Sequence, residues 1–411
     1  MALQITGMPS DPALLDLPWS TALEDWPADR LVALPRGISR HTVRFVRLSG
    51  QVYAVKEVGE RLSQREYRLL RDLVRLDSPC VEAVAVVTGR TSPAGEPLDS
   101  ALITRHLQFS LPYRAVFSGT IRPETLTRLI DALAVLLVRL HLAGFFWGDC
   151  SLSNTLFRRD AGAFAAYLVD AETGELHPTI SAGLRAHDIE VAHVNIYGEL
   201  LDLEAGGLLH PDIDPERVAE RISRRYEELW GVLTEAETVA VVEWHRVEAR
   251  LRRLNGLGFD VAEMQIIRTP DAEKVVVRPK VVDAGHHQRR LMRLTGLDVE
   301  ENQARRLLGD LDAFRAALRD AGQDDDEEIA AHRWLSELFQ PTVRAVPQDL
   351  HRKLEAAQVY HEVLDHRWYV SEAAGHDVGL AAATRSYLET VLTHRPDEKA
   401  ILGEPLPTSE P

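Results

Sequence analysis

Several residue types and patterns are scarce in this chain of 411 residues. Two cysteines, Cys80 and Cys150, are too few for a disulfide framework or a cysteine-rich metal site. No apolar run reaches the roughly 18 residues that a membrane-spanning helix needs, and the first residues lack the basic and apolar regions of a secretory signal. A formal net charge of −16 argues against broad binding to nucleic acid or to anionic membranes. We therefore expect a cytoplasmic protein that does not bind membranes.

Lysine and asparagine are also scarce, with five lysines and four asparagines in the whole chain. One lysine, Lys56, ends the strand-like stretch Val52-Tyr53-Ala54-Val55-Lys56. One asparagine, Asn154, ends the loop-like stretch Gly148-Asp149-Cys150-Ser151-Leu152-Ser153-Asn154. A chain that uses both residues so rarely still has one of each where phosphoryl transfer requires them.

The spacing of Asp149, Asn154 and Asp170 is typical of a kinase. Asp149 precedes Asn154 by five residues, and a short apolar run then leads to Asp170. In this arrangement the first carboxylate positions the attacking hydroxyl, and Asn154 and Asp170 hold Mg²⁺ against the nucleotide phosphates. Glu172 is a candidate further metal ligand. The structural alternatives are a turn or cap role for each of these residues, and a solvated turn for Glu172.

Lys56 is the candidate partner of the nucleotide phosphates. Ala54 lies two residues earlier on the same face of the strand, where its small side chain leaves room for adenine. Glu66, on a helix expected over residues 63–76, is the candidate ion-pair partner of Lys56. The alternatives are a surface lysine on an edge strand, and a capping box in which Glu66 pairs with Ser63 at the start of the helix.

Two further segments are candidates for supporting roles. Ser39 and Arg40 follow Gly37 in the loop that should cover the phosphates, although this loop has a single glycine where three are expected. Asp188 lies near the start of a helix expected over residues 188–205, where it either caps the helix or holds the backbone of the catalytic loop.

The order of the predicted elements indicates an α+β fold with two lobes. Alternation over residues 43–58 around Ser49-Gly50 predicts a β-hairpin, and apolar residues with helical period predict a long helix over residues 123–143 that ends at Gly144. We expect an irregular segment (1–30), a protein-kinase-like domain (31–211), a mainly helical domain (212–395) and a loose tail (396–411). Within the helical domain, a hairpin is expected near residues 264–278 and a helix over residues 235–254.

These residues resemble the atypical protein-kinase-like families, in particular the bacterial lipopolysaccharide (Kdo) kinases and the RIO-like kinases, joined to a helical domain of unknown function. The stretch from Gly148 to Asn154 is similar to their His-Gly-Asp-x-x-x-x-Asn loop, and Val169-Asp170 to their metal-binding strand. The resemblance covers about residues 30–210 and implies ATP and Mg²⁺ as cofactors. Trp147 stands where these families have histidine, and Ala171-Glu172 stands where protein kinases have Phe-Gly.

The sequence therefore predicts an ATP- and Mg²⁺-dependent kinase that acts on a hydroxyl of an acceptor, which could be a protein, a sugar or another small molecule. The alternative is a pseudokinase that senses nucleotide or serves as a scaffold and presents the helical domain to a partner. A nucleic-acid-binding regulator is disfavoured by the net charge.

Overall fold

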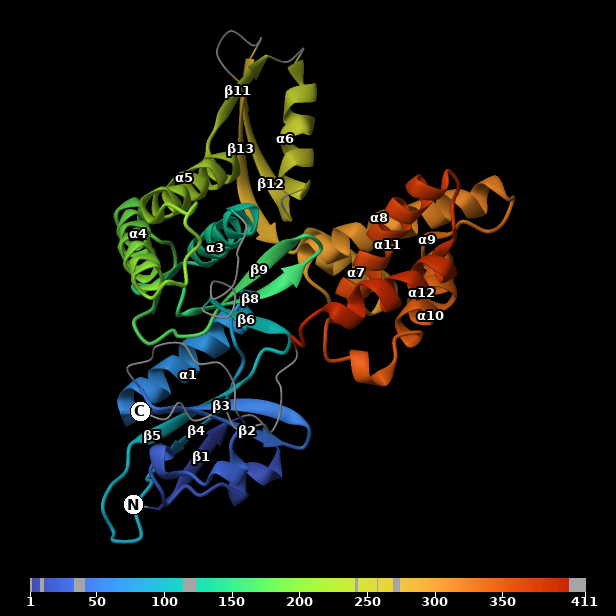
Figure 1. The fold of residues 1–411 in the computed structure, drawn as a ribbon. Helices are drawn as coiled ribbons and strands as arrows, with labels where there is room; N and C mark the ends of the chain where they lie inside the picture. Colours follow the sequence, from blue (N-terminus) through green and yellow to red (C-terminus); the bar gives the residue numbers. More distant parts are fainter. Residues whose placement is uncertain are drawn as a thin grey trace. The chain divides into compact units, whose positions relative to one another are not determined.

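The computed structural model describes residues 2–7, 11–32, 41–113, 123–240, 243–256, 258–268 and 274–398. The chain divides into two compact units (Figure 1). Among the described residues, unit 1 comprises those within 2–158 and 166–226, and unit 2 comprises those within 159–165 and 227–398. Unit 1 thus includes the N-terminal segment and reaches beyond the boundary expected at residue 211.

A five-stranded antiparallel sheet opens unit 1, with strand order β1-β4-β5-β3-β2. The predicted hairpin is confirmed as β2 and β3, and Ser49 and Gly50 make its turn with φ of 45° and 84°. Helix α1 follows β3 and begins at Glu60, earlier than predicted. The bounds are β1 Gln4–Gly7, β2 Val43–Leu48, β3 Gln51–Val58, α1 Glu60–Arg75, β4 Ala83–Thr88 and β5 Ser100–Arg105.

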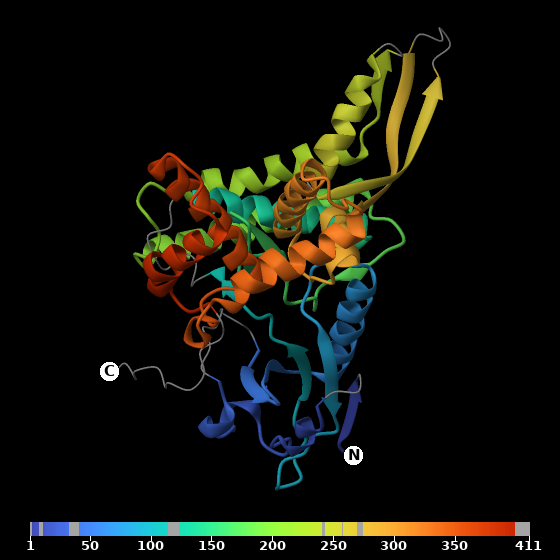
Figure 2. The ribbon, with the colours of Figure 1, turned by 90° about the vertical axis from the view of Figure 1, so that its right-hand side faces the viewer.

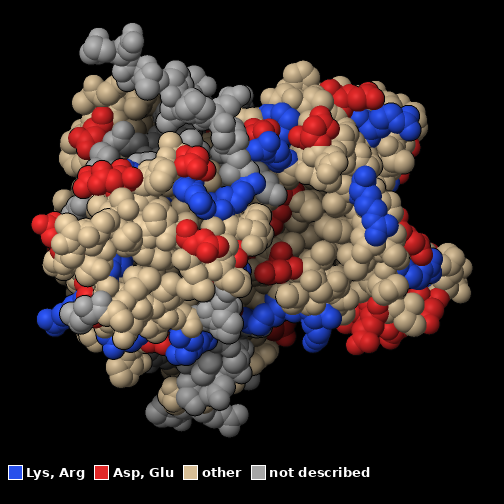
Figure 3. Space-filling view, turned by 90° about the horizontal axis from the view of Figure 1, so that it is seen from below, with Lys and Arg blue, Asp and Glu red and all other residues tan. Residues whose placement is uncertain are grey.

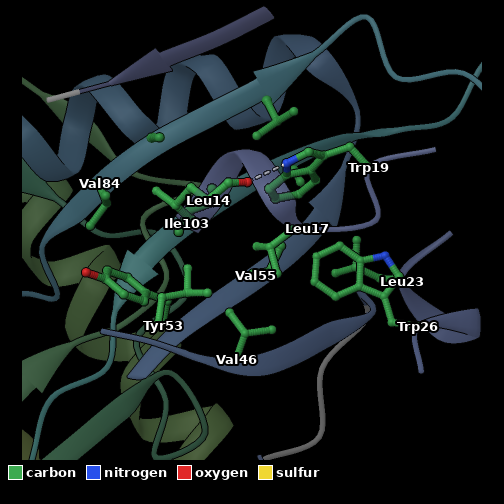
Figure 4. Packing of buried hydrophobic residues seen from close by; sticks show 14 residues of the cluster. Leu14, Leu17, Trp19, Leu23, Trp26, Val46, Tyr53, Val55, Val84 and Ile103 are labelled. Atoms are coloured by element: carbon green, nitrogen blue, oxygen red, sulfur yellow. Dashed lines mark hydrogen bonds between the residues drawn. The ribbon is translucent and has the colours of Figure 1, made fainter. Parts of the chain in front are cut away.

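The N-terminal segment covers one face of this sheet, and α1 lies on the other (Figure 1). Trp19 and Trp26 are buried and meet edge to face, with ring centroids 5.3 Å apart. The Trp19 indole donates to the Leu14 carbonyl at 2.8 Å, as Figure 4 shows beside Val55 and Ile103 of the sheet. Since side chains alternate along a strand, burying Val55 on this face leaves Lys56 to the face that carries α1.

The second part of unit 1 is built around the predicted long helix, which is α3. Gly144 follows α3 with φ of +83°, and a Cβ there would collide with the carbonyl oxygen of His177, so glycine is required. The elements are β6 Ser110–Pro112, α3 Pro123–Leu142, β7 Phe145–Phe146, β8 Thr155–Asp160, β9 Ala163–Leu168, β10 Glu175–Leu176 and α4 Ala182–Ala205. Helix α5 (Pro215–Thr234) packs its first turns on α3, where Arg221 contacts Asp131 at 3.0 Å.

Unit 2 combines a three-stranded sheet, ordered β11-β13-β12, with a bundle of helices (Figure 2). The predicted hairpin is confirmed as β12 and β13. The helix predicted from residue 235 is wrong at its start, because residues 237–240 form β11 beside β13. The bounds are β11 Glu237–Ala240, α6 His245–Gly256, β12 Phe259–Arg268, β13 Lys274–Ala284, α7 His286–Thr295, α8 Glu301–Asp320, α9 Glu327–Trp334, a π-helical turn Leu335–Phe339, α10 Gln340–Arg344, α11 Ala356–Ala374 and α12 Leu380–Thr390.

The tip of the β8–β9 hairpin belongs to unit 2. Its Asp160 is fully buried and accepts hydrogen bonds from the backbone N–H groups of Asn302 and Gln303, at 3.1 and 2.7 Å, at the start of α8. Burial raises the pKa of Asp160 to about 6. The amide of Gln303 also donates to the carbonyl of Arg159 at 3.1 Å. Unit 2 therefore holds this tip through buried hydrogen bonds.

The predicted α+β class with a mainly helical second part is confirmed by these elements. No helix among the described residues is long and apolar enough to cross a membrane. On the face drawn in Figure 3, acidic and basic side chains are interspersed.

Candidate functional site

Strand β3 places Lys56 at the centre of a cluster of three carboxylates. The Lys56 ammonium lies 3.0 Å from Glu66 Oε2, 2.7 Å from Asp170 Oδ2 and 3.1 Å from Glu172 Oε2. Only 11% of the Lys56 side chain is exposed. The alternative of a surface lysine on an edge strand is wrong, because β3 pairs with β2 on one side and with β5 on the other.

Helix α1 brings Glu66 to Lys56, so the two residues form the predicted ion pair. The capping-box alternative is wrong, because α1 begins at Glu60 and its N-cap is Gly59. Ser63 therefore lies inside the helix, where its hydroxyl donates to the Glu60 carbonyl at 2.9 Å. Glu66 lies six positions after the helix start, and its side chain is only 2% exposed beside Lys56.

The pKa values in this cluster reflect an excess of negative charge. Burial lowers the pKa of Lys56, but the charges of Glu66 and Asp170 and their hydrogen bonds outweigh it and hold this pKa above its ordinary value. Burial, and after it the charge of Asp170, raises the pKa of Glu66 to about 7 against the attraction of Lys56. The ammonium is thus charged at neutral pH, whereas burial favours the neutral form of Glu66.

The predicted catalytic loop brings Asp149 and Asn154 together. The Asn154 amide donates to Asp149 Oδ2 at 3.2 Å and to the Asp149 carbonyl at 3.0 Å. A second amide comes from α4, where Asn195 donates to Asp149 Oδ1 at 3.1 Å and to the Cys150 carbonyl at 3.1 Å. Each carboxylate oxygen of Asp149 therefore accepts a hydrogen bond from a different asparagine.

Asp188 holds the start of this loop. It is fully buried within α4 and accepts from the backbone N–H groups of Trp147 at 2.7 Å and Gly148 at 2.6 Å. His141 lies 3.0 Å from the same carboxylate, and its other ring nitrogen lies 2.7 Å from the Tyr226 hydroxyl. The N-cap of α4 is Ser181. The alternative of Asp188 as a cap is therefore wrong, and its support of the loop backbone is confirmed.

The same helix holds the end of the loop through Glu199, which accepts from the backbone N–H groups of Leu152 and Ser153 at 2.7 and 2.9 Å. Asp188, Asn195 and Glu199 are spaced by seven and four residues, so they lie on one face of α4. We did not identify Asn195 and Glu199 from the sequence. The scarcity of asparagine and this helical spacing were the two signals that could have identified them.

Trp147, which replaces the usual histidine, links the loop to Asp170. Its indole N–H donates to the Asp170 carbonyl at 2.9 Å, and its own carbonyl accepts from the Thr173 hydroxyl at 2.8 Å. Trp147 is fully buried. A tryptophan therefore supplies a hydrogen bond that ties the loop to the segment carrying the candidate metal ligands.

The segment after Asp170 is held by several contacts. The Glu172 N–H donates to Asp170 Oδ1 at 2.9 Å, and His41 Nε2 lies 2.8 Å from Glu172 Oε2. Arg65, next to Glu66 on α1, donates to the Gly174 carbonyl at 2.7 Å. Glu172 lies in the turn closed by Gly174, whose N–H donates to the Ala171 carbonyl at 3.0 Å, but it is not merely solvated, since its carboxylate contacts both Lys56 and His41.

The residues around Lys56 have the donor set that Mg²⁺ prefers. Glu66, Asp170 and Glu172 each offer an oxygen, and these oxygens lie within 4.8 Å of one another. With all three ionised, three negative charges face the single positive charge of Lys56, which leaves a net charge of −2 in the cluster. Hard oxygen ligands and unbalanced negative charge suit a divalent cation. Asn154 adjoins this cluster, because the Val169 N–H donates to its backbone carbonyl at 3.1 Å.

The remaining predicted residues differ in how far the structure describes them. Ala54 lies on β3 in register with Phe45 of β2 and Thr104 of β5. Ser39 and Arg40 lie outside the described residues, so their predicted contact with phosphates stays a prediction. Cys150 is fully buried, and burial raises the pKa of its thiol well above the ordinary value, as expected for a packed residue and not for a nucleophile.

The comparisons with known proteins divide the chain into two matched regions. The model of the lipopolysaccharide kinase (Kdo/WaaP) family matches residues 42–195, and that of a domain of unknown function, DUF4032, matches residues 228–392. No curated protein matches the chain. Among solved structures, a structure described as WaaP in complex with acyl carrier protein is 18% identical, with 62% of this chain and 99% of that chain covered and a TM-score of 0.36. That similarity is too low to support an argument.

The match to the kinase family spans Lys56, Glu66, Asp149, Asn154 and Asp170. The match to DUF4032 lies within unit 2. The predicted resemblance is confirmed in both regions. The match of residues 42–195 to the lipopolysaccharide kinase (Kdo/WaaP) family supports a kinase, and a separate C-terminal region matches DUF4032.

Proposed function

We propose that this kinase transfers the γ-phosphoryl group of ATP to a hydroxyl of its acceptor, with Mg²⁺ as the cofactor. The observation that carries the proposal is the position of Lys56, 3.0 Å from Glu66 on α1 and 2.7 Å from Asp170. In phosphoryl-transfer sites a lysine held by a helix glutamate pairs with the nucleotide phosphates, and an aspartate at this position holds the metal.

Lys56 has a compact positive charge in a site where only 11% of its side chain is exposed, so its attraction for phosphate is weakened little by solvent. Asp170 and Glu172, together with Asn154, would hold Mg²⁺. When bound, this ion would neutralise the charge that the phosphates carry and would orient them. Ala54 would face the adenine, and Ser39 and Arg40 would contact the phosphates.

Asp149 would act on the acceptor. Its carboxylate accepts hydrogen bonds from two neutral amides, which fix its orientation without neutralising its charge. In the proposed step the acceptor oxygen forms a bond to the γ-phosphorus, the bond from that phosphorus to the bridging oxygen of ADP breaks, and the hydroxyl proton passes to Asp149. The products are ADP and the phosphorylated acceptor.

The proposal also covers the chemical class of the acceptor and the location of the protein in the cell. A protein, a sugar or another small molecule could supply the hydroxyl, and the nucleotide requirement fits a cytoplasmic location, where ATP is present. The pseudokinase alternative is disfavoured, because a scaffold has no need for Lys56, Asp149, Asn154 and Asp170 together.

Thermal unfolding with Mg²⁺-ATP and with ATP plus EDTA tests the proposal. At about 100 times its dissociation constant, a ligand stabilises the native state by roughly 2.7 kcal/mol, which corresponds to a rise of a few degrees in the Tm. We expect this rise with Mg²⁺-ATP in the wild-type protein and in Asp202→Asn, an exposed position on α4. The rise should be absent with EDTA and in Asp170→Asn and Lys56→Met.

A rise that persists in Asp170→Asn and Lys56→Met would place the nucleotide elsewhere in the molecule. The absence of any rise at millimolar Mg²⁺-ATP would contradict the proposal and favour the scaffold.

A further inference from the structure

Asn195 donates a hydrogen bond to Asp149 from outside the catalytic loop. It comes from the middle of α4, 46 residues along the chain, and donates to Asp149 Oδ1 at 3.1 Å. The same amide group donates to the Cys150 carbonyl at 3.1 Å. One side chain thus contacts both the carboxylate of the proposed base and the backbone that follows it.

The chemical type of this donor matters. A lysine or arginine at the same place would neutralise the carboxylate and make it a poorer base, whereas a neutral amide restrains its rotation and leaves its charge intact. A carboxylate oxygen can accept more than one hydrogen bond. Oδ1 can therefore hold the Asn195 amide and still receive a proton from a substrate hydroxyl.

The position of Asn195 is itself fixed from both sides along α4. Seven residues before it, buried Asp188 accepts from the backbone of Trp147 and Gly148, and four residues after it, Glu199 accepts from the backbone of Leu152. These two anchors accept hydrogen bonds from backbone groups of the loop, whereas Asn195 donates to the side chain of Asp149. Helix α4 therefore holds the loop backbone, and Asn195, together with Asn154, orients the Asp149 carboxylate.

We propose that Asn195 is a positioning residue, which orients the Asp149 carboxylate toward the acceptor hydroxyl without contacting the acceptor or the nucleotide. This inference rests on the proposed function. It adds a residue that lies outside the catalytic loop and outside the metal-binding strand. It predicts that changes at Asn195 alter turnover while the affinity for Mg²⁺-ATP stays the same.

The contact can be tested without any activity, because the chain has only four asparagines. Labelling with ¹⁵N-asparagine gives four pairs of side-chain amide signals, each assigned by its loss in the matching alanine variant. In Asp149→Ala the pairs of Asn154 and Asn195 should shift, and that of Asn302, which donates to Asp160, should not. An Asn195 pair that does not respond to Asp149→Ala would overturn the inference.

The role is tested by phosphate release from Mg²⁺-ATP with water as the acceptor. Asn195→Ala should lower kcat by roughly 10- to 100-fold, as expected when a reacting group loses its alignment, with an unchanged Kd for Mg²⁺-ATP. Asp202→Ala, exposed on the same helix, should behave as the wild type.

The outcomes separate this inference from the proposed function. No phosphate release by the wild-type protein would overturn the proposed function, and with it a role for Asn195 in turnover. Wild-type kinetics in Asn195→Ala would overturn the role of Asn195 alone. A kcat loss accompanied by an equal loss of nucleotide affinity and a lower Tm would show a structural role, and would overturn the inference as well.

Discussion

Replacing Lys56 by methionine should reveal how strongly this ammonium balances the carboxylates around it. The substitution keeps a long unbranched side chain and removes the charge. Glu66, whose side chain is 2% exposed, would then remain close to Asp170 and Glu172 without the Lys56 ammonium. The protein can relieve this repulsion only by taking up a proton or a metal ion.

The size of the effect follows from the distances. At an effective dielectric constant of about 20, two unit charges 3.0 Å apart attract by roughly 5.5 kcal/mol. The desolvation of the ammonium offsets part of this attraction, and breaking a buried ion pair by removing one partner costs about 3–5 kcal/mol. We expect the free energy of unfolding to fall by about 3 kcal/mol at pH 8.5 without metal.

The loss of unfolding free energy in Lys56→Met should become smaller as the pH falls. Burial raises the pKa of Glu66 to about 7, whereas its ordinary value is 4.5. Because this is an acid with a raised pKa in the folded state, proton uptake stabilises the fold below pH 7, and this stabilisation is lost as the pH rises through 7. Without Lys56 the pKa of Glu66 rises further, so at pH 5.5 a neutral carboxyl lies beside the methionine and the loss should be about 1 kcal/mol.

Urea unfolding in the presence of EDTA measures the loss of unfolding free energy of Lys56→Met at pH 5.5 and at pH 8.5. Arg61→Met, exposed on α1, removes one positive charge without touching the cluster and serves as the control. The double variant Lys56→Met/Glu66→Gln should show little dependence on pH over this range. A loss below about 0.5 kcal/mol at pH 8.5, or an equal loss at both pH values, would refute this account of the cluster.

Two further predictions concern the loop that carries Asp149. Asp188→Ala leaves the buried N–H groups of Trp147 and Gly148 unpaired at about 1–3 kcal/mol each. Urea unfolding of Asp188→Ala should therefore show that the free energy of unfolding falls by roughly 3 kcal/mol, and by less in Asp188→Asn. A fall in Asp188→Ala that is no larger than in Asp188→Asn would contradict this prediction. Cys150 is fully buried, and burial raises the pKa of its thiol. In a Cys80→Ser variant, Ellman's reagent should therefore react with Cys150 only as the protein unfolds. Fast reaction with the native protein would contradict the burial of Cys150.

The elements that the sequence predicted well are those whose signals are local. The hairpin of β2 and β3 follows from alternation and the Ser49-Gly50 turn, and α3 follows from a regular apolar stripe and Gly144. Lys56 and Asp170 were identified because the chemistry of phosphoryl transfer fixes their order and spacing. The structure brings these two residues within 2.7 Å of each other across 114 residues of chain.

The features that were missed depend on partners far away in the chain. Residues 237–240 carry a weak helical pattern and become a strand only because β13 offers its edge. Asn195 and Glu199 lie on a helix whose orientation the sequence does not define, so nothing local shows that they face the loop. The start of α4 was misplaced because Asp188 was a plausible cap, whereas Ser181 performs that role and Asp188 is buried.

The hairpin of β8 and β9 has a consequence for how the chain can be divided. Asn154 directly precedes β8 and Asp170 follows β9, so the open end of the hairpin carries two candidate metal ligands, while its tip around Asp160 belongs to unit 2. A truncation that ends after residue 226 would strip this tip of Asn302 and Gln303 and expose a carboxylate that folding had buried. A single truncation point therefore cannot separate unit 1 from unit 2. A shortened kinase would need the tip of the β8–β9 hairpin replaced by a polar turn.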